Sequence, residues 1–169
     1  MDAASHYRQL VQLGRDDFLA SAAPGALIRQ RSSSDDAPMS GVHTLTLDQE
    51  IEETLPGRVM PALETTIELY PLTKKHGASF PDRITIGRTG NNDVVIPDSS
   101  VSRLHAYVRR DGARWLVADA GSKNGSWLAD EPLAARKERP LVSRAVLRLG
   151  DVDLTFYLAA DLFAALGGR

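Results

Sequence analysis

The chain has 169 residues, of which 43% are hydrophobic and 25% are charged, as in an ordinary globular protein. Its 20 basic and 22 acidic residues give a net charge of −2, which argues against a bulk nucleic-acid binder or a membrane-surface binder. The absence of cysteine excludes disulfides, thiolate metal sites and cysteine nucleophiles. We expect a cytoplasmic protein, because the sequence shows neither a signal-like N-terminus nor an apolar run of membrane length.

The first part of the sequence predicts helices followed by a linker. Apolar residues recur at a spacing of three to four over the first 21 residues, and Gly14 divides this stretch into two helices. A Pro-Gly pair ends the pattern, and the apolar residues 26–28 are too few to classify. Residues 32–41 are rich in turn formers and are the best linker candidate. Strict alternation then predicts a strand over 42–47, before an acidic segment over 48–55.

From residue 67 onward, short apolar runs alternate with turn residues, which is the pattern of short β-strands. The predicted strands cover residues 67–72, 83–87, 94–96, 105–110, 114–119, 127–128, 145–149 and 152–158. Asp111-Gly112 and Gly150-Asp151 are hairpin signals, whereas residues 129–140 read as a polar, basic connection. A short helix is expected over 159–166. Many short strands at nearly regular spacing indicate a β-sandwich.

Three polar clusters lie between these strands. They read Gly87-Arg88, Ser102-Arg103-Leu104-His105 and Ser122-Lys123-Asn124-Gly125. Arginine forks, hydroxyls and backbone N–H groups suit phosphate oxygens, and an asparagine side chain suits a peptide main chain. No general base accompanies the hydroxyls, and the histidines lack the spacing of metal ligands. We therefore expect an anion-binding protein and not an enzyme, with no cofactor and no metal.

In their order and spacing, these clusters resemble those of a forkhead-associated (FHA) domain, over roughly residues 67–158. The resemblance implies an all-β fold, a sandwich of about eleven short strands whose loops at one end bind phosphothreonine peptides. We expect three parts in the chain. They are a partly helical N-terminal extension with a linker and an acidic segment (1–62), the FHA sandwich (63–160), and the end of a short C-terminal helix with a tail (161–169).

The resemblance also implies roles for individual residues. Arg88 would contact the phosphate or brace the peptide, Ser102 would hydrogen-bond a phosphate oxygen, and Arg103 occupies a phosphate-facing position. Asn124 would bind the peptide main chain. The full set of expected phosphopeptide-binding residues is Arg88, Ser102, Arg103, Ser122, Lys123 and Asn124.

Gly87, His105 and Gly125 would support the site and not touch the ligand. Lys123 is a departure, because many members of the family carry a phosphate-contacting threonine there. That contact either becomes an ammonium–phosphate pair or is lost. Ser126 also stands where threonine is usual, which keeps the hydroxyl but not the β-branching.

The implied partners are a phosphothreonine-containing protein or peptide and a Ser/Thr protein kinase, with neither nucleic acid nor membrane. Two alternatives stay open. One is a phosphate-independent adaptor that docks through a face of the sandwich, an alternative that Lys123 leaves open. The other is a regulatory or transcription-linked protein in which the first part of the chain is the effector and the FHA domain is the sensor.

A further hypothesis concerns Thr54 and Thr65, which follow acidic residues ahead of the sandwich. Some small bacterial FHA proteins resemble this layout, in which a phosphorylated threonine folds back into the domain's own site and closes it. We favour the simpler interpretation, because acidic segments with threonine are common. The neighbouring Thr66 alternates with apolar residues and reads as an exposed strand residue.

Overall fold

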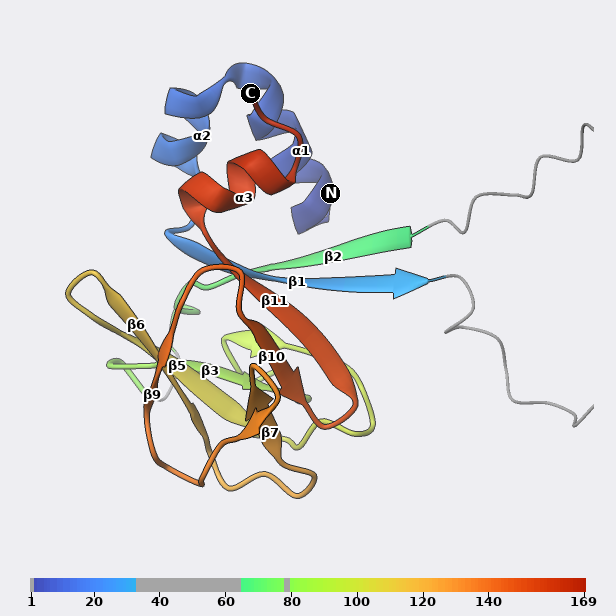
Figure 1. The fold of residues 1–169 in the computed structure, drawn as a ribbon, viewed down its shortest axis with the longest axis vertical. Helices are drawn as coiled ribbons and strands as arrows, with labels where there is room; N and C mark the ends of the chain where they lie inside the picture. Colours follow the sequence, from blue (N-terminus) through green and yellow to red (C-terminus); the bar gives the residue numbers. More distant parts are fainter. Residues whose placement is uncertain (1, 33–64, 78–79) are drawn as a thin grey trace, which may run out of the picture.

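The computed structural model describes residues 2–32, 65–77 and 80–169, which form two β-sheets packed on each other and three short helices (Figure 1). The predicted fold is confirmed, because these residues contain eleven strands arranged as a sandwich. The predicted strand over 42–47 lies outside the described residues, as does Thr54. Within the described part of the chain, no helix is both long and apolar enough to span a bilayer.

The six-stranded sheet has the order β2-β1-β11-β10-β7-β8. Its strands are β1 (Gly25–Ser32), β2 (Thr65–Pro71), β7 (Ser126–Leu128), β8 (Glu131–Pro132), β10 (Val146–Leu149) and β11 (Val152–Leu158). The five-stranded sheet has the order β4-β3-β5-β6-β9. Its strands are β3 (Ile84–Gly87), β4 (Val94–Val95), β5 (Ala106–Asp111), β6 (Arg114–Asp119) and β9 (Arg139–Leu141). The polar connection predicted over 129–140 therefore contains β8 and part of β9, which are short edge strands with little apolar pattern.

The helices α1 (Ala3–Leu13), α2 (Arg15–Ser21) and α3 (Ala159–Ala165) lie together at one end of the molecule (Figure 1). Asp2 caps α1 by accepting the Ser5 N–H at 2.8 Å. Gly14 separates α1 from α2 as predicted, and its φ of 109° lies in the left-handed region that glycine tolerates. The predicted helical start and the terminal helix are thus both present.

Two apolar cores hold these parts together. The first fills the space between the sheets and includes Leu27, Ile86, Val108, Leu147 and Phe156. The second lies between the helices and the outer face of β1 and β2, and includes Tyr7, Phe18, Ile28, Leu69 and Leu162. Fully burying one such side chain contributes roughly 1.5–3 kcal/mol, so the helices are anchored to the six-stranded sheet.

Strand β1 was not predicted, although it lies between β2 and β11. Ala26 and Ile28 face the helices while Leu27 faces the core between the sheets, so both faces of the strand are buried. A strand buried on both faces shows a continuous apolar run and not an alternating one, which explains why residues 26–28 could not be classified. Because β1 precedes residue 62, the predicted boundary at that residue assigns this strand of the sheet to the N-terminal extension.

Candidate functional site

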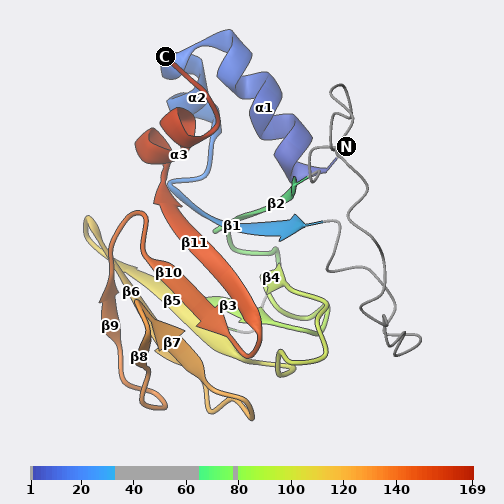
Figure 2. The same cartoon turned by 45° about the vertical axis from the view of Figure 1, so that its right-hand side comes forward.

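The three polar clusters meet at the end of the sandwich that lies away from the helices (Figure 2). The Arg88 main-chain N–H donates to the Ser102 carbonyl at 3.0 Å. The Lys123 N–H donates to Ser102 Oγ at 3.0 Å, and Asn124 Nδ2 donates to the Ser100 carbonyl at 2.8 Å. The loops that follow β3 and β4 and the loop that precedes β7 are therefore joined by direct hydrogen bonds.

Together these loops form an open depression of about 390 Å³, which we call the anion depression. It is lined by Arg88, Ser99, Ser100, Val101, Ser102, Arg103, Leu104, Lys123 and Asn124. The lining has three cationic side chains and no carboxylate, and all three cations are exposed. None of the three pairs with a carboxylate in the described ranges of the chain. The uncompensated positive charge makes this depression suitable for an anion.

Ser102 and Asn124 keep hydrogen-bonding capacity for a ligand. Ser102 Oγ accepts the Lys123 N–H, so its hydroxyl proton is left to donate. Asn124 uses one Nδ2 hydrogen on Ser100 and retains its other hydrogen and its Oδ1 acceptor. Such a pair of free donor and acceptor matches the N–H and C=O of a peptide main chain.

Beneath these loops lies His105, which is fully buried. The Ser102 N–H donates to His105 Nδ1 at 2.9 Å, and His105 Nε2 lies 2.9 Å from the Gly125 carbonyl. Because Nδ1 is an acceptor, the ring proton is on Nε2, which donates to Gly125. Burial lowers the pKa of His105, so the neutral ring joins the Ser102 loop to the Gly125 loop.

This arrangement predicts a loss of stability in mild acid. The unfolded imidazole titrates near 6.5, and the folded pKa is lower, so the unfolded state binds a proton first. The free energy of unfolding should therefore fall as pH drops below 6.5, by up to about 1.4 kcal/mol per pH unit until the folded ring is protonated. Urea unfolding between pH 7.5 and 5 measures this slope. Carboxylates such as Asp119, whose pKa lies below its ordinary 3.8, titrate outside the window.

The assignment to His105 can be checked in the same pH range. The slope should disappear in His105→Gln and persist in His76→Gln, which changes an exposed histidine outside the site. An NMR titration of the His105 ring gives the folded pKa without any variant. A midpoint at or above 6.5 would contradict the buried, neutral ring.

Asp119 at the end of β6 organises the loop that carries Lys123 and Asn124. Its carboxylate accepts the N–H groups of Gly121 and Ser122 at 2.8 and 2.9 Å, and the hydroxyls of Ser122 and Ser126. Although burial alone would raise the pKa of Asp119, these hydrogen bonds hold it below its usual range. Ser122 Oγ also accepts the Gly125 N–H at 3.0 Å. Ser122 therefore serves the loop itself and does not line the anion depression.

The loop that carries Ser102 is positioned from several sides. Asp98 accepts the N–H and the hydroxyl of Ser100 at 3.0 and 2.7 Å, and Arg29 of β1 donates to Asp98 at 3.1 Å. A Cβ on Gly150, whose φ is +59°, would lie 2.4 Å from the Ser100 carbonyl oxygen. The first strand and the last hairpin thus both contact this loop.

Gly87 packs directly against Arg103, which follows Ser102 in this loop. A Cβ on Gly87 would lie 2.1 Å from the Arg103 carbonyl oxygen and 2.6 Å from Asn92 Nδ2. Asn92 is itself buried and donates to the Arg103 and Thr89 carbonyls. Gly87 therefore allows the β3 end to lie beneath the Ser102–Arg103 turn.

Sequence reasoning missed five supporting residues, which are Asn92, Asp98, Ser100, Asp119 and Gly150. The Asp-x-Ser and Asp-x-x-Ser spacings were a local signal for two of them, because such side chains bind the main chain just ahead. Asp93, Asp98 and Asp119 each accept a backbone N–H, from Lys75, Ser100 and Gly121 respectively. No local signal marks Gly150 as a neighbour of Ser100.

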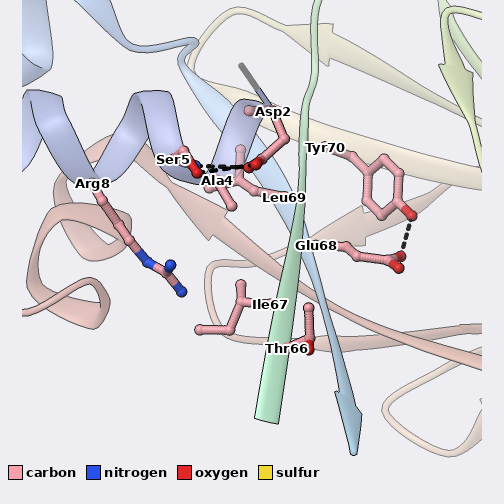
Figure 3. Close-up of a pocket in the computed structure, with 10 residues that line it drawn as sticks. Asp2, Ala4, Ser5, Arg8, Thr66, Ile67, Glu68, Leu69 and Tyr70 are labelled. Carbon is pink, nitrogen blue, oxygen red and sulfur yellow. Dashed lines mark hydrogen bonds between the residues drawn. The ribbon is translucent and has the colours of Figure 1, made fainter. Parts of the chain in front are cut away.

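A second depression, of about 450 Å³, lies between α1 and β2 (Figure 3). Its lining includes Arg8, but also the carboxylates of Asp2 and Glu68. Figure 3 shows Glu68 next to Tyr70, whose hydroxyl donates to that carboxylate at 2.6 Å. Two carboxylates at one opening disfavour a phosphate ligand, so the anion depression is the better phosphate candidate.

Among the described residues, those that line the anion depression include neither of the two threonines named as possible phospho-acceptors. Thr54 lies outside the described residues, and Thr65 is the first residue of β2. Thr66 is exposed in the same strand, as its alternation predicted. Closure of the site by a phosphothreonine of this chain stays a prediction.

The family model for the FHA domain matches residues 84–150, a range that runs from the start of β3 to Gly150 and includes every loop of the site. Residues of this chain are 36% identical over 72 positions to an oxoglutarate dehydrogenase inhibitor of Corynebacterium diphtheriae, covering 43% of this chain and 48% of the relative. They are 38% identical over 65 positions to the glycogen accumulation regulator GarA of Mycolicibacterium smegmatis, covering 38% of this chain and 35% of the relative.

The chain thus spans less than half the length of these curated relatives. Among solved structures, Mycobacterium tuberculosis EmbR in complex with a low-affinity phosphopeptide aligns with a TM-score of 0.43 and 29% identity. That alignment covers 47% of this chain and 20% of the EmbR chain.

Proposed function

We propose that the protein binds phosphothreonine peptides and acts downstream of a Ser/Thr protein kinase. The first ground for this proposal is the match of the FHA domain model to residues 84–150. One observation carries the proposal. Arg88, Arg103 and Lys123, none of which pairs with a carboxylate among the described residues, line a single open depression together with Ser102. A phosphothreonine side chain offers the matching ligand, because it carries about two negative charges and three acceptor oxygens at neutral pH.

The mechanism is equilibrium capture by charge-assisted hydrogen bonds. The guanidinium groups of Arg88 and Arg103 and the hydroxyl of Ser102 would donate to phosphate oxygens, at about 1.5–3 kcal/mol for each bond. Asn124 would bind the peptide main chain beside the phosphate. The Lys123 ammonium lines the same depression, which supports an ammonium–phosphate pair in place of the hydroxyl contact that many family members make.

The same lining supports binding and not catalysis. It contains neither a carboxylate nor an imidazole, and both ring nitrogens of the underlying His105 are occupied by Ser102 and Gly125. Among the described residues, the lining therefore offers no general base to the Ser102 hydroxyl. We also propose that the protein is cytoplasmic, as expected from the sequence, because it must share a compartment with the phosphorylated substrates of the kinase.

The test is calorimetric titration with a phosphothreonine peptide library and with matched phosphoserine and unmodified libraries. We expect binding of the phosphothreonine peptides, weaker binding of phosphoserine peptides and none of the unmodified ones. Equal binding of phosphorylated and unmodified peptides would favour the phosphate-independent adaptor and overturn the proposal.

A further inference from the structure

Two consecutive residues of β1 contact different parts of the molecule. Ile28 packs in the core beneath the helices. Arg29 lies on the other face of the strand, two residues after Leu27, which belongs to the core between the sheets. The Arg29 guanidinium donates to the Asp98 carboxylate at 3.1 Å. Strand β1 therefore connects the helical N-terminal part of the chain to the loop that carries Ser102.

The pair of Arg29 and Asp98 is largely shielded from solvent. The Arg29 side chain is 15% exposed and that of Asp98 is 26% exposed. Glu68 of β2 is paired in register with Arg29, and Figure 3 shows its side chain on the side of β2 that faces away from α1. Its carboxylate lies farther from Arg29, at 4.0 Å, and also pairs with Arg31 at 3.3 Å. Asp98 is thus the closer partner of Arg29, and their shielded contact is screened less than a surface ion pair.

Asp98 holds the backbone of the loop through Ser100. Its second oxygen accepts the Ser100 N–H at 3.0 Å and the Ser100 hydroxyl at 2.7 Å. The Ser100 carbonyl in turn accepts Nδ2 of Asn124 at 2.8 Å, and both residues line the anion depression. Although burial alone would raise the pKa of Asp98, the hydrogen bonds from Ser100 and Arg29 hold it below its ordinary 3.8. The carboxylate is therefore charged at neutral pH.

We propose that Arg29 is a positioning residue for phosphopeptide binding, which acts through Asp98 and Ser100. The inference rests on the proposed function and deepens it, because it assigns part of the site to the N-terminal extension. Arg29 is not among the described residues that line the anion depression. It determines where the Ser100 carbonyl lies, and with it the Asn124 side chain. Loss of the contact between Arg29 and Asp98 should raise the dissociation constant of a phosphothreonine peptide by about tenfold.

The experiment distinguishes positioning from a simple effect of charge. Arg29→Met removes a positive charge and keeps an unbranched side chain, whereas Asp98→Asn removes a negative charge. If the pair acted only through its electric field, Arg29→Met would weaken the binding of a dianionic phosphothreonine and Asp98→Asn would strengthen it. Positioning predicts that both variants bind one phosphothreonine peptide about tenfold more weakly in calorimetric titration. The double variant should be no weaker than either single variant, because the two changes break the same contact.

Two further variants serve as controls. Arg29→Lys keeps a positive charge that can reach Asp98, so it should recover most of the affinity that Arg29→Met loses. Arg139→Met makes the same change of charge away from the anion depression, where Arg139 of β9 pairs with Glu131 of β8 at 2.6 Å. This variant should bind the peptide like wild type.

A measurement on the free protein tests the loop directly. Amide hydrogen exchange should be faster in Arg29→Met at Ser100 and at Lys123, whose N–H donates to Ser102 Oγ. Amides in the hairpin of β5 and β6 should keep their wild-type rates. A general loss of stability would instead accelerate exchange in both places, so the comparison identifies a local effect on the loop.

The outcomes separate this inference from the proposed function. If wild type binds no phosphothreonine peptide, the proposed function fails, whereas unchanged exchange at Ser100 in Arg29→Met overturns only the inference. Wild-type affinity in both Arg29→Met and Asp98→Asn would show that the loop keeps its place without the pair. Affinity changes of opposite sign in these two variants would show a field effect in place of positioning. Either result would overturn the role of Arg29.

Discussion

Replacing Arg88 or Ser102 with alanine should abolish measurable binding of a phosphothreonine peptide while the protein stays folded. The Arg88 side chain is exposed and pairs with no carboxylate in the described parts of the chain, so its loss leaves no internal partner unsatisfied. Its contribution to folding is through the main-chain N–H, which alanine retains. Each charge-assisted hydrogen bond lost from the complex costs about 1.5–3 kcal/mol, which is a factor of roughly 10–150 in affinity.

Ser102→Ala differs from Arg88→Ala in one respect. The Ser102 hydroxyl also accepts the Lys123 N–H, so its removal costs about 0.5–1.5 kcal/mol of stability in addition to the ligand contact. Calorimetric titration measures the binding of both variants, and urea unfolding measures their stability. Arg8→Ala is the matched control, because it removes an exposed arginine from α1 without touching the anion depression. Wild-type affinity in both Arg88→Ala and Ser102→Ala would show that the phosphate binds elsewhere.

The second large effect is expected at Gly87. A methyl group there would approach the Arg103 carbonyl oxygen to 2.1 Å, and this backbone atom cannot rotate away. Gly87→Ala must therefore push the Ser102–Arg103 turn outward or shift the end of β3. Overpacking of this kind costs about 1–3 kcal/mol of stability, and the displaced turn should lose phosphopeptide affinity as well.

Gly90→Ala in the same loop is the control for Gly87→Ala. In the described parts of the chain, a Cβ on Gly90 would meet nothing within 4 Å, and its φ is not in the left-handed region, so the stability should change little. Urea unfolding gives the stability of both variants and calorimetry gives their affinity for one phosphothreonine peptide. An unfolding midpoint and an affinity of Gly87→Ala equal to those of wild type would contradict the close packing of these two loops.

The sequence alone predicted the sandwich because strand patterns are local. The apolar run in residues 115–118, the Asp111-Gly112 turn and the alternation in residues 152–158 each depend only on neighbouring residues, and all three correspond to observed strands or turns. The three polar clusters were visible for the same reason, since each one interrupts such a pattern. Their order was enough to predict which loops the structure brings together around the anion depression.

Only the tertiary structure decided which residues hold those clusters together. Three contacts join residues that are distant in sequence: Gly150 with Ser100, Arg29 with Asp98, and Asn92 with Arg103. The sequence around these residues does not predict the contacts. The same holds for β1, whose place between β2 and β11 depends on partners more than 30 residues away. Local composition determines which elements form and which side chains their loops carry. Long-range packing determines which of those side chains line the anion depression, as Lys123 does, and which bind within their own loop, as Ser122 does.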